Sequence, residues 1–206
     1  RYHNIMFALV ESGSITKILN GTRGITIDGI QHPRAIFSLW TEAERNAIGI
    51  YEITIDNSKR KDEKWYINTD ITYAFSGGKV TGSYGDATAK AHADTLYTAQ
   101  DETDGLGTEG EIKSEGLKTG LIRDVKAQAA SELERTDWYV VRKSEESTAI
   151  PSAITTHRRA VRSKAAAMET SITNASDTPA LETLYTYTKQ EDGSVTRPLG
   201  ELPTLE

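Results

Sequence analysis

The sequence contains no cysteine, so neither disulfide bonds nor thiolate metal sites are available to it. It has no excess of basic charge either, because its 206 residues carry a net charge of −6 at pH 7. Nucleic acids and anionic membranes bind basic faces, so we expect neither as a partner. Long hydrophobic runs are also missing. The N-terminal run of residues 5–10 is too short for a signal peptide or a membrane span, and we expect a protein that is soluble where it is made.

Apolar residues are sparse for a chain of this length. They make up 37% of the sequence, against 26% charged residues. Such a composition is typical of a soluble protein, but it gives little material for one large core. We therefore expect several small apolar clusters, or apolar surfaces that are buried against another chain.

The first hundred residues are rich in β-branched side chains that alternate with polar ones, which is the period of a half-buried strand. We interpret residues 1–100 as a small β-rich N-terminal domain. Within it, Asn20-Gly21 and Gly77-Gly78 predict hairpin turns, because these residues tolerate positive φ. The predicted strands are 2–10, 15–19, 25–30, 50–55, 65–75 and 79–84.

Two short helices are predicted inside this domain. Thr41 is a good N-cap, and Glu44 three residues later completes a capping box. Gly49 suits the position just past the end of that helix. The alanine-rich segment 87–98 predicts the second helix.

Two later segments lack apolar periodicity. Residues 101–116 are acidic and contain glycine, which indicates an exposed linker. Residues 174–206 form a C-terminal arm, in which 179–187 predicts one more short helix. The end of the arm carries Pro198 and Pro203 and few apolar residues, so we expect it to be extended or disordered.

Residues 117–173 have the clearest helical periodicity in the chain. One apolar stripe recurs every four residues, and a second follows steps of three and four after Pro151, which suits a first helical turn. These stripes predict two antiparallel helices in a hairpin, and the whole fold class is α+β. The stripes consist of Leu117, Leu121, Val125, Ala129 and Leu133, and of Ile154, His157, Val161, Ala165, Met168 and Ile172.

The sequence contains no dense catalytic or ligand-binding motif. His92-Ala93-Asp94 is the nearest to a metal or catalytic arrangement, but it lacks a second histidine nearby and fits a helix surface better. The acidic run 101–105 lacks the ligand spacing of a calcium loop. Phosphate-binding glycine loops and Gly-x-Ser-x-Gly elbows are absent from the sequence. We therefore predict no catalytic, cofactor-binding or metal-binding residues and no cofactor.

A family resemblance rests on two stretches. Residues 133–143 run Leu-Glu-Arg-Thr-Asp-Trp-Tyr-Val-Val-Arg-Lys, and after Pro151 residues 156–162 run Thr-His-Arg-Arg-Ala-Val-Arg. They resemble the C-terminal module of many tailed-bacteriophage tail proteins, among them tail-fibre, tail-fibre-assembly and baseplate components. In that module a helix ends in Thr-Asp-Trp, and a second helix carries an Arg-x-x-Val-Arg signature. Residues 32–50 look like the opening of such proteins.

The resemblance implies a structural protein of a phage tail or baseplate, made in the host cytoplasm and carried in the virion tail. It would form homo-oligomers and dock other tail, baseplate or fibre proteins. One alternative is a tail-fibre assembly chaperone, and another is a small hydrolase or metal-binding domain built on the β-rich half. The resemblance implies packing and contact roles for Asp137, Trp138 and the helix of Arg158. The predicted interface residues are Leu121, Val125, Trp138, Ile154, His157, Arg158, Val161, Arg162 and Met168.

Overall fold

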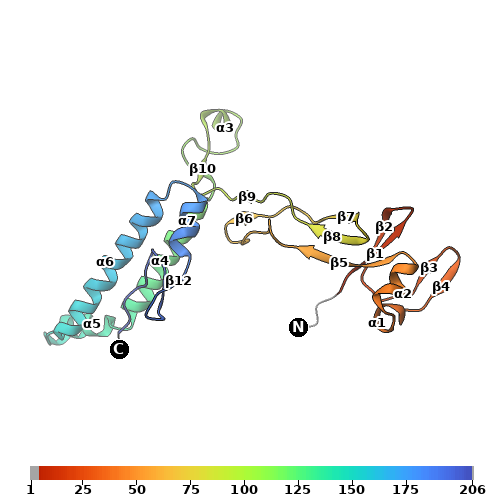
Figure 1. Cartoon of the computed structure of the whole chain (residues 1–206). Helices are drawn as coiled ribbons and strands as arrows, with labels where there is room; N and C mark the ends of the chain where they lie inside the picture. Colours follow the sequence, from red (N-terminus) through yellow and green to blue (C-terminus); the bar gives the residue numbers. More distant parts are fainter. Residues whose placement is uncertain (1–4, 206) are drawn as a thin grey trace. The chain divides into compact units, whose positions relative to one another are not determined.

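The structure of the chain is a computed structural model that describes residues 5–205. It divides into two compact units, Arg1–Thr88 and Ala89–Glu206. The first unit is β-rich and contains a curled five-stranded sheet, and the second packs two long helices antiparallel and ends in short strands (Figure 1). The predicted α+β class is confirmed. The division falls at residue 88, earlier than the boundary predicted at residue 100.

The five-stranded sheet consists of two local hairpins joined by one central strand. Its order is β2-β1-β5-β8-β7, and all neighbours are antiparallel except β5 and β8, which are parallel. Both hairpin turns consist of two residues with positive φ, Ser12-Gly13 and, as predicted, Gly77-Gly78. The strands are β1 (Phe7–Glu11), β2 (Ser14–Leu19), β5 (Ile50–Asp56), β7 (Thr72–Ser76) and β8 (Lys79–Ser83).

Small apolar clusters cover both faces of the central strands. Phe7 and Leu9 lie in one cluster and Ala8 in the other, because successive strand residues point to opposite faces. This division confirms the expectation of several small cores. The first cluster also buries Ile25, Ile27, Ile36 and Ile50, and the second buries Ile53 and Val80.

A hairpin and two short helices complete the first cluster. Asp28-Gly29, with φ of 49° and 79°, is the turn of the hairpin, whereas Asn20-Gly21 does not join a hairpin because β2 and β3 are not paired. The predicted capping box is present: Thr41 Oγ1 accepts from the Glu44 N–H, and the Thr41 N–H donates to Glu44 Oε2 across 2.8 Å. The elements are β3 (Ile25–Ile27), β4 (Ile30–His32), α1 (Ile36–Leu39) and α2 (Glu42–Ala47).

Two predicted elements of this region are wrong. The long strand 65–75 is interrupted after β6 (Tyr66–Ile67), because the Asn68 side chain bonds the backbone N–H and C=O of Lys61 and replaces the ladder bonds. The predicted helix 87–98 is absent. In its place lie the short strands β9 (Thr88–Ala89) and β10 (Thr95–Leu96), and the intervening backbone contacts the next long helix.

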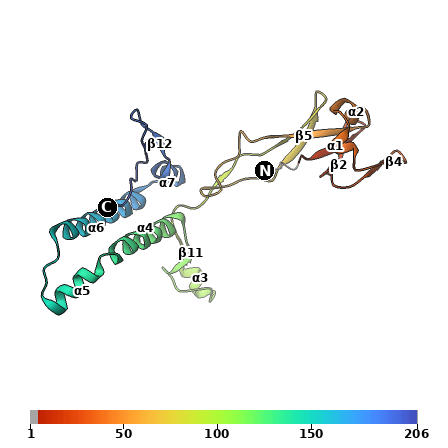
Figure 2. The ribbon, with the colours of Figure 1, turned by 90° about the horizontal axis from the view of Figure 1, so that it is seen from below.

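The second unit confirms the predicted helical hairpin. The helices α4 and α6 lie side by side (Figure 2). Most residues of the two predicted apolar stripes are buried. The prediction missed that a third helix, α5, occupies the connection between them. The helices are α4 (Leu117–Glu134), α5 (Asp137–Glu146), α6 (Ser152–Asn174) and α7 (Thr178–Tyr185). Within residues 5–205, no helix combines the length and the apolar character needed to span a membrane.

The predicted linker and arm contain more structure than their composition indicates. Residues 101–116 contribute to α3 (Ala99–Thr103) and to β11 (Ile112–Ser114), which pairs with β10. In the arm, α7 is followed by a hairpin of β12 (Thr188–Lys189) and β13 (Val195–Thr196). Leu181 and Leu199 are buried, so the arm packs within the second unit.

Candidate functional site

The predicted interface residues separate into a buried group and an exposed group. Trp138 and Arg162 are exposed. The others are at most 9% exposed, so their apolar partner lies within the chain itself and they are not free to bind another protein. The buried group consists of Leu121, Val125, Ile154, His157, Arg158, Val161 and Met168.

The corner between α4 and α5 is held by one buried arginine. Arg158 Nη1 donates to the Leu133 carbonyl across 2.8 Å and to Thr136 Oγ1 across 2.7 Å. Arg158 Nη2 donates to Asp137 Oδ1 across 2.8 Å. Thr136 is only 1% exposed. The guanidinium therefore binds three acceptors of the corner at the same time.

These residue types suit the corner for physical reasons. The Leu133 carbonyl lies at the end of α4, where carbonyls lack helical partners, and it also accepts from Thr136 Oγ1 across 3.0 Å. Asp137 lies in the first turn of α5, where a carboxylate is favoured by the helix dipole. The planar fork of arginine reaches these acceptors together, which the point charge of lysine cannot do. Thr136, Asp137 and Arg158 thus meet here as packing residues.

Exposed apolar side chains lie directly beyond this corner. Trp138, Val140 and Val141 are 51%, 43% and 52% exposed. Trp138 and Val141 are three residues apart and so lie on one side of the helix, and we call these two residues the α5 face. The rings of Trp138 and Tyr139 stack with centroids 3.8 Å apart. The Arg142 guanidinium lies 4.8 Å from the Trp138 centroid. No residue of α5 is buried, so a fixed helix presents unpartnered aromatic and aliphatic surface.

Two basic and two acidic side chains follow the α5 face along the helix, Arg142 and Lys143 and then Glu145 and Glu146. Within residues 5–205, neither Arg142 nor Lys143 forms an ion pair with a carboxylate. The Arg142 Nε atom is inaccessible to solvent and has no hydrogen-bond partner. Sequence analysis missed Arg142, although its spacing four residues after Trp138 predicts a contact on one helix face.

A second polar cluster ties the end of the described chain to α4. His157 Nε2 lies 3.0 Å from Glu132 Oε1, which also accepts from the Leu205 N–H across 3.1 Å. Arg135 Nη1 lies 3.1 Å from the other oxygen. The hydrogen bond from Leu205 is the main cause that lowers the pKa of Glu132. The cluster therefore holds α6 and the end of the described chain against α4.

The candidate catalytic or metal pattern His92-Ala93-Asp94 is a cap for α4. Asp94 Oδ1 accepts from the Gly116 N–H across 2.6 Å and from Thr119 Oγ1 across 2.7 Å. The Leu117 and Lys118 N–H groups donate to the carbonyls of Ala91 and His92. These bonds satisfy the first orphan donors of the helix. The bond from Gly116 is the main cause that lowers the pKa of Asp94.

The surface of the first unit has hollows. One hollow of about 540 Å³ is lined by Glu11, Ser12, Asp28 and His32, among others. In the described part of the chain, no hydrogen bond joins His32 to these three, and His32 packs edge-on against Trp40. Nor do residues 5–205 contain a group of three His, Cys, Asp or Glu side chains that could hold a metal ion.

Comparison with protein-family models, curated proteins and solved structures found no match to this chain.

Proposed function

We propose that this chain is a structural component of a tailed-phage tail or baseplate and that it docks other tail proteins through the α5 face. The observation that supports the proposal is the contrast at the corner. Arg158 holds the corner by three hydrogen bonds, of which the one to Asp137 reaches α5, whereas Trp138 and Val141 on that helix are half exposed. A corner built in this way presents an apolar surface in a fixed orientation. The proposal includes no catalysis, no cofactor and no binding to nucleic acid or membranes.

The energetics of the α5 face suit a docking role. Complete burial of a large apolar side chain stabilises a complex by about 1.5–3 kcal/mol. Tryptophan is enriched among residues that dominate binding energy, and the Trp138 side chain of this face is half exposed. Because α5 is fixed before binding, a partner would not have to order it, so less conformational entropy is lost on association.

The test is incorporation of the chain into particles. We expect mass spectrometry of purified virions to find the wild-type protein at a fixed stoichiometry. Trp138→Ala with Val141→Ala should reduce its incorporation by at least about tenfold, since about 1.4 kcal/mol corresponds to that factor. Ser144→Ala, on the same helix and exposed, is the matched control. Circular dichroism and thermal unfolding of each isolated chain check that the fold is intact. Normal incorporation of the double variant contradicts the proposal.

A tail-fibre assembly chaperone would use the same exposed face, because transient binding to a folding partner also requires accessible apolar surface. The particle measurement separates the two roles. A chaperone would be absent or substoichiometric in mature virions, and it would instead bind a fibre protein during its assembly.

A further inference from the structure

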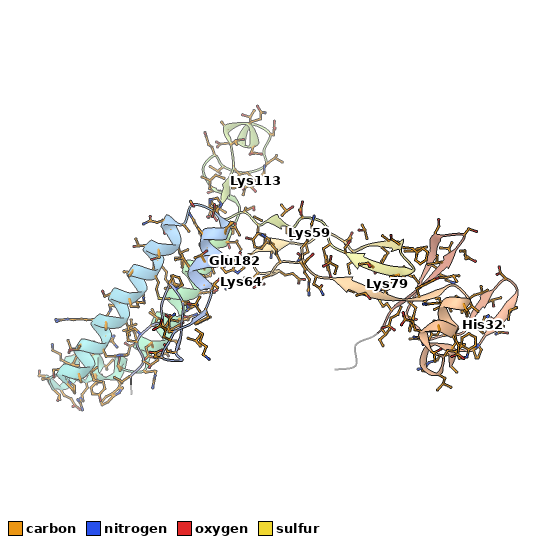
Figure 3. All side chains as sticks on the ribbon, in the orientation of Figure 1. His32, Lys59, Lys64, Lys79, Lys113 and Glu182 are labelled. Atoms are coloured by element: carbon orange, nitrogen blue, oxygen red, sulfur yellow. The ribbon has the colours of Figure 1, made fainter. Side chains whose placement is uncertain are left out.

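The loop between β2 and β3 contains an asparagine–glycine pair that is not part of a hairpin. Asn20 is exposed, and Gly21 follows it with a φ of 67°. The loop is held at both ends. A Cβ on Gly21 would lie 3.2 Å from the Phe7 ring, and a Cβ on Gly24 would lie 2.6 Å from the carbonyl oxygen of His32, which is labelled in Figure 3. The loop therefore presents Asn20 to solvent in a fixed backbone conformation.

An asparagine that precedes glycine can react with its own backbone. The nitrogen of the next residue attacks the side-chain Cγ, and glycine permits this approach because it has no Cβ to hinder it. Within residues 5–205, the Gly21 N–H donates no hydrogen bond, and neither does Asn20 Nδ2. The attacking nitrogen and the leaving amine are therefore both without competing hydrogen bonds in the described chain.

Thr22 directs two donors at the atom on which charge develops. Its backbone N–H donates to Asn20 Oδ1 across 3.2 Å, and its hydroxyl donates to the same oxygen across 2.7 Å. When the nitrogen attacks Cγ, Oδ1 becomes an oxyanion, and donors that already point at this oxygen lower the barrier. The loop thus combines an available nucleophile with a stabilised oxyanion.

Two other asparagines are followed by an N–H that is already bonded. After Asn57, the Ser58 N–H donates to Asp56 Oδ1 across 2.9 Å. After Asn174, the N–H of Ala175 donates to a carbonyl of α6 across 3.3 Å. In both places the nucleophile would first have to give up its hydrogen bond.

The remaining two asparagines of residues 5–205 are constrained in other ways. Asn68 Oδ1 and Nδ2 bond the N–H and C=O of Lys61 across 2.9 and 2.8 Å, so its amide is held on another chain segment. Asn46 and the residue after it both lie within α2, where backbone N–H groups enter the helical hydrogen bonds. The structure therefore distinguishes Asn20 from the other four.

We propose that Asn20 is a site of spontaneous deamidation in the folded protein and that Thr22 assists the reaction. The Gly21 nitrogen bonds to Asn20 Cγ and loses its proton. The Cγ–Nδ2 bond breaks, and ammonia leaves with that proton, so that a cyclic succinimide remains. Water then adds to either ring carbonyl. Addition at the former Cγ produces an aspartate, and addition at the backbone carbonyl carbon produces an isoaspartate, whose main chain runs through the side chain.

Both products alter the loop, and the isoaspartate alters it more. Each adds a negative charge at position 20, and the isoaspartate also lengthens the main chain. Gly21 lies against Phe7 and Phe37 of the first apolar cluster, so a longer chain must displace the glycine from these rings or press it into them. We therefore expect the modified first unit to unfold at a lower temperature than the original one.

The test is incubation of the purified full chain at neutral pH, followed by peptide mapping with mass spectrometry. Position 20 should gain the mass difference between an amide and an acid and should yield both aspartate and isoaspartate peptides. We expect this conversion to be at least about tenfold faster than at Asn57, whose neighbouring N–H is bonded. Intact Asn20 in the folded chain, under conditions in which a peptide of residues 17–24 converts, overturns the proposal.

Two variants test the chemistry of the loop. Gly21→Ala should slow the conversion by at least about tenfold, because a Cβ hinders the attack. Thr22→Val removes the hydroxyl donor with little change in shape and should slow it by about two- to tenfold. Thr26→Val, at an exposed position on β3, is the matched control and should react like the wild type. Circular dichroism checks that each variant is folded. If Thr22→Val reacts at the wild-type rate, the proposed assistance by Thr22 is overturned.

Discussion

Arg158 Nη2 and Asp137 Oδ1 are 2.8 Å apart, and this contact joins the second turn of α6 to the first residue of α5. The arginine side chain is nearly buried, whereas the aspartate is more than half exposed. The buried partner therefore positions the exposed one. Through this contact, the packing of the helical hairpin determines the direction in which the α5 face points.

Replacing Arg158 should test how strongly this corner depends on the planar guanidinium. Arg158→Ala leaves the Leu133 carbonyl and Thr136 Oγ1 without their charged donor, and we expect it to lower the free energy of unfolding by about 2–3 kcal/mol. Arg158→Lys should recover only part of this loss, because lysine lacks the fork. Urea unfolding measures both. Arg159→Ala, on the exposed side of the same turn, should change little, and an equal loss there would refute the assignment.

Two glycines at the start of α4 give a matched pair of substitutions. A Cβ on Gly116 would overlap the backbone of Ala93, so we expect Gly116→Ala to destabilise the protein by about 1–3 kcal/mol. Gly120 has no atom within 4 Å of the added Cβ and lies inside the helix. Gly120→Ala should therefore stabilise the protein by about 0.5–1 kcal/mol. Thermal unfolding of both variants should move in opposite directions, and a common sign would show that the 91–94 backbone does not cap α4.

Substitution of the His92-Ala93-Asp94 pattern distinguishes a helix cap from a metal or catalytic site. Asp94→Ala removes the acceptor for the Gly116 N–H and should lower the Tm. His92 contacts the helix through its backbone carbonyl, so His92→Ala should leave the Tm unchanged. Added Zn²⁺ should not raise the Tm of the wild type. A Zn²⁺-dependent stabilisation that both variants abolish would restore the metal-site hypothesis.

The acid titration of Asp101 should report on the folding of residues 95–114, which contain β10, α3 and β11. Its pKa is lowered from 3.8 to about 2, chiefly because Lys113 donates to it. Because the pKa of Asp101 is lower in the folded state than in the unfolded state, its ionised carboxylate stabilises the folded segment above pH 3.8. This stabilisation is lost as the pH falls toward about 2. Carboxyl NMR should place the midpoint near the lower value. Lys113→Gln should raise it, whereas Lys118→Gln, which bonds Thr173 in the native chain, should not.

The sequence predicted elements that repeat a long pattern and missed those that depend on distant partners. The seam of α4 and α6 follows from a stripe of many residues, and Thr41 with Glu44 is a familiar capping box. The equivalent capping box of Thr98 and Asp101 was not predicted, because α3 has only 5 residues and no apolar stripe.

The corner itself could be predicted only in part. The resemblance implied packing and contact roles for Asp137 and for the helix of Arg158, but it did not predict that these two side chains bond to each other. The burial of Arg158 results from acceptors 21 to 25 positions earlier in the chain, and no local pattern encodes such a contact. The exposure of the α5 face likewise could not be predicted, because it depends on which parts of the folded chain pack against α5.

The central position of β5 in the first unit has a consequence for the order of folding. The hairpins β1–β2 and β7–β8 pair residues that are close in sequence and can form within about 1–10 μs. By contrast, β5 pairs Phe7 with Glu52 and Ile53 with Val80, so it must close two long loops. We expect the docking of β5 to be the slow step of folding. Until β5 pairs with both hairpins, they should exist as separate, partly exposed two-stranded sheets.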